Sequence, residues 1–289
     1  MRFAQAMGLV AVLTAGMMSA SAVYAASPNV EVPKTVDIQE MTWPELKAAL
    51  EASKTTALFY TGGTEQRGPQ NIIAGHNYIG REVVKHIAEK LGNAIAMPVM
   101  PFSPTNADPR IPGNIGLNVD TLGLVMENVT EQAIANGFKN VVLMGDSGGG
   151  QGPDGMYDKL AKKLNAKHSP QGVRVIYVSD PYIEAREAYG KIIAERGLPQ
   201  GSHGSIEDTS EMMYLETLPG NSKNWVRKDQ LPNTEGAPFV NGKAQRGPNT
   251  PHNGIMGDAR KASVELGKLR HDMKVDYSVK RIQSALAAK

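Results

Sequence analysis

The chain has 289 residues and a formal net charge of +2, and 41% of its side chains are hydrophobic. This near-neutral charge gives no electrostatic basis for binding nucleic acid, and an aromatic content of 6% leaves few rings for stacking on a polymer. The chain contains no cysteine, which excludes a disulfide framework, a thiolate nucleophile and thiolate metal ligands. A chain of this length can form one large domain with a substantial core.

The first 25 residues have the pattern of a secretory signal peptide. Arg2 supplies the positive start, Met7 to Met18 is an apolar stretch, and small residues at Val23 and Ala25 precede the expected cleavage site. A membrane span needs about 20 apolar residues, and this stretch is shorter and interrupted. We therefore predict cleavage after Ala25, a periplasmic or secreted protein, and no attachment to the membrane afterwards.

After the signal peptide, strands and helices are expected to alternate. Residues 26–40 are polar and contain proline, which indicates an N-terminal arm, and residues 41–289 are expected to form a single domain. The first helix is predicted over 41–53, with Thr42 as its N-cap and Pro44 in its first turn. Further helices are predicted over 78–91, 117–136, 153–165 and 181–196. Strands are predicted over 56–63, 94–102, 140–145 and 173–179.

The C-terminal part has a different pattern. A helix is expected to begin near Ser205 or Asp208, residues 219–253 resemble a long surface excursion, and residues 258–288 have a helical pattern. Strands and helices that alternate at this spacing predict an α/β fold, a three-layer α/β/α domain with a mostly parallel sheet. Ligands bind such sheets beyond the carboxyl ends of the strands. The Gly-rich loops after Tyr60 and after Met144 both occupy that position.

Four stretches carry residues suited to chemistry: "GGTEQRGPQ" followed by "GHN", then "PGNIGL", "MGDSGGGQ" and "HGSIEDTS". Zinc takes about four ligands, and a catalytic site leaves one position to water. The chain offers four such ligands, with Asp146 as a further candidate: Glu65, His76, His203 and Asp208. A second ion would need a bridging carboxylate, whereas Asn77 is neutral and Arg67 is a permanent cation. The sequence thus predicts one divalent ion, zinc or manganese, or none.

In this order, the four stretches resemble the creatininase family from about Met41 to Leu269. The resemblance implies a creatininase-like α/β fold and hydrolysis of an amide C–N bond, often in a ring, with a pair of divalent ions. It also implies assembly into a homo-oligomer, commonly a hexamer. Glu65 and His203 match family positions and Asp208 stands where a glutamate is usual. Arg67, Gln70 and Ser147 replace family histidines.

Two functional hypotheses follow. In the first, the protein is a periplasmic metal-dependent amidohydrolase of the creatininase class, in which metal-bound water attacks the amide. Glu65, His76 and Asp208 hold the ion, His203 polarises or protonates the substrate, and Arg67 binds a substrate carboxylate. In the second, the protein is a metal-free small-molecule-binding protein on the same fold. Its pocket would use these predicted substrate-binding residues: Arg67, Gln70, Ser147, Gly148 and Gly149.

Structural alternatives remain for each of these residues. Glu65 could cap backbone amides, His76 could be exposed at a helix start, and His203 could bond locally. Asp208 could be a helix N-cap, and we favour Asp146 as a residue that ties down the glycine loop. A triad of Ser147, His203 and Asp208 is also conceivable.

Overall fold

The computed structural model describes residues 30–240, 242–245, 247 and 252–287. The predicted signal peptide lies outside the described residues. The centre of the fold is a four-stranded parallel sheet with the order β2-β1-β3-β4. Its strands are β1 (Thr56–Thr61), β2 (Ala94–Ala96), β3 (Asn140–Gly145) and β4 (Arg174–Tyr177). The two central strands pair over their full length, from Thr56 beside Asn140 to Thr61 beside Gly145.

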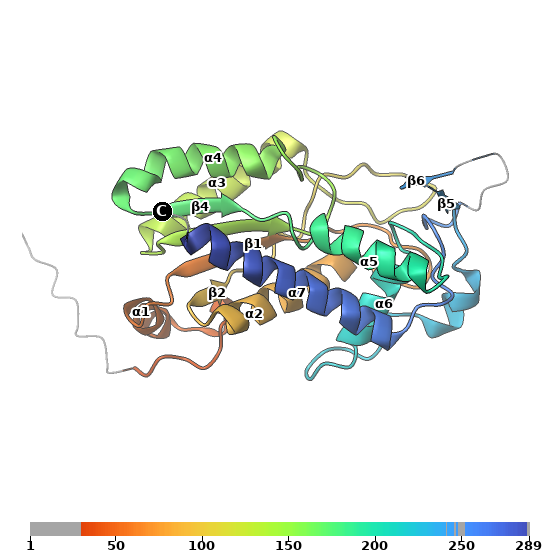
Figure 1. Ribbon diagram of the computed structural model, residues 1–289, viewed down its shortest axis with the longest axis horizontal. Coiled ribbons are helices and arrows are strands. Elements are labelled where there is room, and N and C mark those ends of the chain that lie inside the picture. Colours follow the sequence, from red (N-terminus) through yellow and green to blue (C-terminus); the bar gives the residue numbers. More distant parts are fainter. Residues whose placement is uncertain (1–29, 241, 246, 248–251, 288–289) are drawn as a thin grey trace, which may run out of the picture.

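Helices cover both faces of this sheet (Figure 1). One face carries α1 (Trp43–Glu51), α3 (Val119–Ala135) and α4 (Met156–His168), and the other carries α2 (Gly75–Leu91) and α7 (Val264–Ala287). Two further helices, α5 (Glu184–Glu195) and α6 (Ile206–Leu215), lie beyond the carboxyl ends of the strands. Short 3₁₀ helices span Ile38–Glu40, Ser169–Gln171 and Lys228–Asn233, and β5 (Phe239–Val240) pairs with β6 (Lys243–Ala244).

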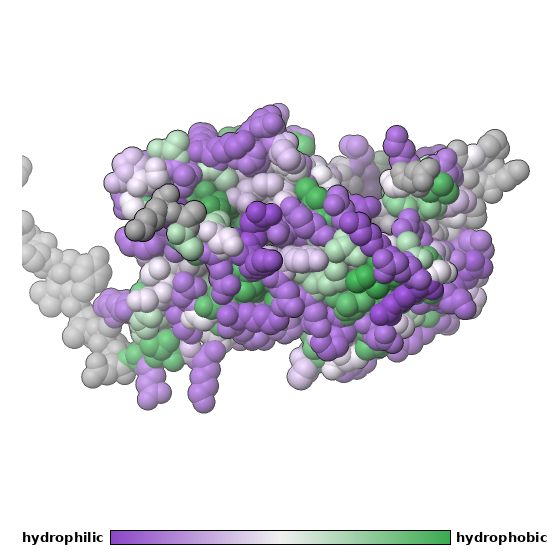
Figure 2. Space-filling model, viewed as in Figure 1, coloured by the Kyte–Doolittle hydropathy of each residue, from purple (hydrophilic) through white to green (hydrophobic). Residues whose placement is uncertain are grey.

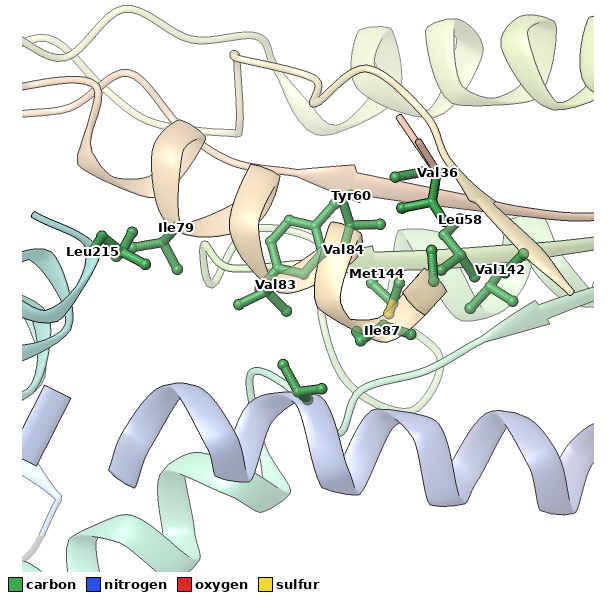
Figure 3. Close-up of a cluster of buried hydrophobic side chains, with 14 of the residues drawn as sticks. Val36, Leu58, Tyr60, Ile79, Val83, Val84, Ile87, Val142, Met144 and Leu215 are labelled. Atoms are coloured by element: carbon green, nitrogen blue, oxygen red, sulfur yellow. The ribbon is translucent and has the colours of Figure 1, made fainter. Parts of the chain in front are cut away.

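Each central strand supplies side chains to two separate cores, because successive residues of a strand point to opposite faces. Leu58 and Tyr60 pack with Val83 and Ile87 of α2, as Figure 3 shows. Ala57 and Phe59 belong to the second core, under α3 and α4. All residues of β1 are buried, as expected for a strand covered on both faces. The predicted three-layer α/β fold is therefore confirmed.

The helix ends agree with the local sequence. Thr42 is the N-cap of α1, and its backbone N–H donates to the Glu45 carboxylate over 2.7 Å. α2 ends at Gly92, whose φ of 75° is a left-handed conformation that glycine adopts readily. The second predicted strand stops after Ala96, and Pro98 and Pro101, which have no backbone N–H, follow in the rest of the predicted range.

The surface of the molecule is mainly hydrophilic on the face that carries α7, with smaller hydrophobic areas between the helices (Figure 2). Within the described part of the chain, no helix has the length and apolar character required to cross a membrane.

Candidate functional site

The first part of the site is the loop that follows β1. Its glycine residues allow this loop to lie close to the start of α2. The Gly63 N–H donates to Asn77 Oδ1 over 2.8 Å, and a Cβ on Gly62 would overlap the same oxygen. Asn77 therefore positions the loop, and the preceding residue, His76, is the one that reaches the site. The loop carries Glu65, whose side chain is 12% exposed.

His76 lies between two carboxylates. Its Nε2 is 2.7 Å from Glu65 Oε1 and its Nδ1 is 2.6 Å from Asp146 Oδ2. A neutral imidazole has one N–H, so two contacts of this kind require the doubly protonated ring. Burial and the charge of Arg67 lower the pKa of His76. The charge of Asp146 and the hydrogen bonds to both carboxylates outweigh these effects and raise it to about 9. His76 is thus an imidazolium cation at neutral pH.

Asp146 connects His76 to a lysine of the C-terminal helix. Lys274 is 1% exposed, and its Nζ lies 2.6 Å from Asp146 Oδ1 and 2.8 Å from Glu211 Oε2. Burial acts to raise the pKa of Asp146, but Lys274 and His76 hold it well below its ordinary value. Tyr60 donates a further hydrogen bond to Asp146 Oδ1 over 3.2 Å. Asp146 is ionised, with a donor on each of its oxygens.

Further positive and negative side chains alternate from Lys274 to the carboxylates of α6. Arg270 Nε lies 3.0 Å from Glu211 Oε2, and its Nη1 lies 2.5 Å from Glu207 Oε2. All three side chains are at most 9% exposed. We call this chain of buried groups the ion network, and define it by these residues together with the pair described next: Glu65, His76, Asp146, Lys274, Glu211, Arg270, Glu207, Asp208 and Arg67.

Arg67 and Asp208 form the last pair of the ion network. Arg67 Nη2 lies 2.9 Å from Asp208 Oδ1, although its angles are not those of a hydrogen bond. The Arg67 side chain is fully buried, and its guanidinium fills the space above Gly75, where a Cβ would overlap it. Asp208 Oδ2 accepts the Gly204 N–H over 2.8 Å. Burial favours the neutral acid, but the charge of Arg67 keeps the Asp208 pKa well below its usual range.

His203 has one nitrogen free on the side that faces Glu65. Its Nε2 lies 2.6 Å from the Gln66 carbonyl oxygen and 3.1 Å from Gln66 Nε2, and the shorter contact, to an acceptor, assigns an N–H to this position. Burial lowers the pKa of His203, so the ring is neutral and its Nδ1 carries a lone pair. This Nδ1 lies 3.7 Å from Glu65 Oε1. Two hydrogen-bond acceptors thus face each other. Glu65 Oε1 already accepts from His76 Nε2, whereas His203 Nδ1 has no donor among the described residues.

These two acceptors open on a small polar cavity of about 210 Å³. Its wall contains Ser147, Gly148, Tyr182, Arg186, Ser202 and Met256, together with members of the ion network. A wider groove of about 1050 Å³ also reaches Glu65 and His203, between the segments 105–111 and 252–256. A small molecule can therefore approach the acceptor pair from outside.

The donors present do not fit a divalent ion of the kind predicted. Both nitrogens of His76 contact carboxylates, so the ring would have to lose a proton and one of these contacts before it could bind a metal. Asp208 is held by Arg67 and Gly204, and Asp146 by Lys274 and His76. Glu65 and His203 remain, and two ligands are fewer than the three protein ligands of a catalytic zinc site. Among the described residues, no three metal-ligating side chains are arranged around a common point.

The structure brings some of the predicted site residues together and separates others. Ser147 and Gly148 line the small cavity with Glu65, His76, His203 and Asp208. The other predicted substrate-binding residues are absent from that wall: Arg67, Gln70 and Gly149. Arg67 is buried against Asp208, and Gly149 packs against Pro104. Gln70 is fully buried and donates to the Gly204 carbonyl over 2.6 Å and to Thr209 Oγ1 over 2.9 Å.

The structure also decides between the functional and the purely structural roles that the sequence allowed for several of these residues. His76 is 7% exposed, so it is not a solvent-exposed helix start. Ser205 is the N-cap of α6, and Asp208 lies in its first turn. No hydrogen bond in the described part of the chain joins Ser147 to His203 or Asp208, so the serine triad is not assembled. Asp146 bonds side chains of the site, and not the glycine loop as we favoured.

Sequence reasoning missed the residues that α5, α6 and α7 contribute. These are Glu207 and Glu211 beside Asp208, Arg270 and Lys274 in the C-terminal helix, Arg186 in the first turn of α5 and Tyr182 just before that helix. A signal exists in the i, i+4 spacing of Arg270 with Lys274 and of Glu207 with Glu211. Side chains at this spacing share one face of a helix.

The sequence model of one family, named Creatininase and described as creatinine amidohydrolase, matches residues 39–282. A search among curated proteins gives no match. Among solved structures, a creatininase variant complexed with creatine has 21% identity and a TM-score of 0.67, over 88% of this chain and all of that one. A variant of "Zn-Zn type" has 20% identity and a TM-score of 0.66, over 89% of this chain and 100% of its own. A manganese form has 19% identity and a TM-score of 0.66, over 88% and 100%. At these identities the structures show a shared fold.

Proposed function

Because the chain belongs to the creatininase family, we propose that it is an exported, metal-independent protein that binds a small molecule on this fold. The ligand places an N–H group, from an amine or an amide, between Glu65 and His203. The observation that carries this proposal is the pair of acceptors 3.7 Å apart, Glu65 Oε1 and His203 Nδ1, at the wall of a polar cavity. Glu65 Oε1 already accepts a hydrogen bond from His76 and has a further lone pair, and His203 Nδ1 has no donor among the described residues. A ligand N–H would supply a donor to both atoms.

The ion network supports the metal-independent part of the proposal. Its positive charge comes from the chain itself, because Arg67, His76 and Lys274 each contact a carboxylate of the site. A divalent ion would have to displace these buried cations from their partners. Removing one partner of a buried ion pair costs about 3–5 kcal/mol, so each displacement would weaken metal binding strongly.

A second candidate is a hydrolase that acts on an amide C–N bond, in a ring or in an open chain. It is favoured by His203, whose neutral ring and free Nδ1 suit a general base beside a carboxylate. If this hydrolase used one divalent ion, its ligands would be Glu65, His203 and at least one further side chain that gives up its partner in the ion network. The solved creatininases of zinc and manganese type belong to the same family, which is the reason to test this form directly.

Metal content distinguishes these functions. We expect protein purified from the periplasm without chelators to contain far less than one equivalent of zinc or manganese per chain, measured by mass spectrometry of the elements. We also expect thermal stability to stay unchanged on treatment with a strong chelator. About one equivalent of metal that is lost in Glu65→Gln would contradict the metal-independent proposal and favour the metal-dependent hydrolase.

Ligand binding tests the acceptor pair itself. Amines and primary amides should bind to the wild-type protein in calorimetry, and Glu65→Gln should weaken binding about tenfold or more, as expected for a lost hydrogen bond to a charged group. Glu51→Gln, an exposed carboxylate at the end of α1, is the matched control and should leave binding unchanged. Turnover of the bound amide, followed by release of amine, would identify the protein as an enzyme.

Export and assembly form part of the same proposal. The signal-peptide pattern of residues 1–25 supports export, and N-terminal sequencing of the mature protein should begin at Ala26. We also propose a homo-oligomer, by analogy with the hexamers common in the family. Light scattering of the purified protein measures this directly, and a monomeric mass would contradict it.

A further inference from the structure

Arg186 is a cation that makes no ion pair with any described residue and lies in the wall shared by two cavities. It lies in the first turn of α5 and is partly buried. Its side chain makes no ion pair or hydrogen bond with any described residue, and its guanidinium carbon lies 5.8 Å from the centre of the Tyr182 ring. Tyr182 and Arg186 both line the small polar cavity and a second cavity of about 300 Å³. A guanidinium in a wall that two cavities share can bind an anionic group.

The second cavity has a largely apolar wall. It lies between α5 and the hairpin of β5 and β6, and its apolar members are Ile183, Tyr189, Ile193, Ile206 and Phe239. Glu207 also belongs to the wall, but its carboxylate is already bound by Arg270 Nη1 over 2.5 Å. Glu187 lies on the exposed side of α5. The cavity can thus accommodate a hydrophobic group, with Arg186 in the wall that it shares with the polar cavity.

We propose that the protein binds an α-amino acid with an apolar or aromatic side chain. The ammonium group lies in the polar cavity between Glu65 and His203, the carboxylate contacts Arg186, and the side chain occupies the cavity beside α5. This inference rests on the proposed function, because it assigns the N–H donor of that function to the ammonium group.

The charge of the site selects a zwitterion over a simple anion or amine. The ion network and Arg186 together contain five carboxylates and five cations, and these are Glu65, Asp146, Glu207, Asp208 and Glu211, with Arg67, His76, Arg186, Arg270 and Lys274. Burying an uncompensated charge is costly. An amino acid carries one positive and one negative group, so it pairs with both Glu65 and Arg186 and leaves the balance unchanged.

Calorimetry with matched probes tests this inference on the full mature protein. The panel contains both enantiomers of leucine, methionine and phenylalanine. It also contains phenethylamine, which lacks the carboxylate, and 3-phenylpropionate, which lacks the ammonium. We expect phenylalanine to bind more tightly than either partial probe. Arg186→Met should weaken phenylalanine binding about 10- to 100-fold and leave phenethylamine binding unchanged, because hydrogen bonds to charged groups contribute about 1.5–3 kcal/mol.

Two further variants define the role of the charge. Arg186→Lys should retain part of the affinity, because the positive charge remains without the planar fork. Lys191→Met removes a cation from the exposed side of the same helix, outside both cavities, and should change nothing. A merely structural role of Arg186 would instead weaken phenylalanine and phenethylamine equally, and that result overturns the inference.

The remaining outcomes are also decisive. If no amino acid of the panel binds at millimolar concentration, or none binds more tightly than its matched amine, the inference is wrong. Phenethylamine binding that depends on Glu65 would in that case leave the proposed function standing. Loss of both the amino acid and the Glu65-dependent amine binding would remove the proposed function as well.

Discussion

Lys274→Met tests whether the ion network stabilises the fold. The Lys274 ammonium is 1% exposed and lies within 2.8 Å of both Asp146 and Glu211. Methionine keeps an unbranched apolar chain of similar length, so the change removes mainly the charge. Removing one partner of a buried ion pair costs about 3–5 kcal/mol. Because a domain of this kind is stable by only about 5–15 kcal/mol in total, the loss should shift unfolding to much lower urea concentration.

The cost of this substitution should depend on pH, with a defined sign. In the wild-type protein the Asp146 pKa is held well below its ordinary value, against the effect of burial, largely by the charges of Lys274 and His76. This carboxylate therefore adds stability above the unfolded pKa of about 3.9, and the contribution is lost as pH falls further. Without Lys274 the folded-state pKa of Asp146 rises. The buried carboxylate is then protonated, and its charge removed, at a higher pH than in the wild-type protein. The difference between the two proteins should thus decrease as pH falls towards the ordinary carboxylate range of about 4.

The assay is urea unfolding followed by tryptophan fluorescence, in which the buried Trp225 should report the transition because Trp43 is already exposed in the folded protein. Lys268→Met is the matched control, because Lys268 lies on the same helix and its Nζ is 2.6 Å from Asp272 in an exposed pair. Exposed pairs contribute about 0–1 kcal/mol, so this variant should stay close to the wild type. Equal costs for the two lysine substitutions, or a Lys274 cost that does not decrease in acid, would refute the reasoning.

Two further predictions concern neighbouring parts of the ion network. Gly75→Ala should destabilise the protein by about 1–3 kcal/mol in urea unfolding, because its Cβ would overlap the buried Arg67 guanidinium. Gly190→Ala is the control: a Cβ at Gly190, in α5, would meet no other atom. This variant should stabilise the protein by about 0.5–1 kcal/mol, because alanine favours a helix more than glycine does. The folded-state pKa of His76 is raised to about 9, so its contribution is fully present below about pH 6.5 and is lost as pH rises through 9. His76→Gln should abolish that alkaline loss, and an imidazole NMR titration with a midpoint near pH 6.5 would contradict it.

The fold could be predicted from the sequence because its signals are local. The buried run Thr56–Thr61, the cap at Thr42 and the glycine stop at Gly92 each depend on a few adjacent residues. The alternation of strands and helices then predicts the parallel sheet and its ligand-binding edge. The predicted range of the second strand was too long because its apolar pattern continued past Ala96 through two prolines.

The site could be predicted only in part because its chemistry depends on contacts between distant segments. Glu65, His76 and His203 were identified from short motifs, and they do lie around one cavity. Their protonation states were not predictable, because they are set by Asp146 and Arg67 and by a backbone carbonyl at Gln66. Lys274 comes from a helix near the C-terminus for which the sequence predicted only a helical pattern.

In the proposed metal-independent site, Arg67 and His76 act together against a divalent ion, so a substitution at one of them alone should not create a zinc site. Arg67→His removes the cation beside Asp208 but leaves the His76 imidazolium bound to Glu65 and Asp146. Neither this variant nor His76→Asp alone is expected to bind zinc at stoichiometric level. The double variant removes two buried positive charges and adds a carboxylate next to Glu65, and a divalent ion would compensate for that change. Equilibrium dialysis with zinc measures all three proteins. Stoichiometric zinc in the Arg67→His single variant would show that the imidazolium of His76 is not the barrier to metal binding.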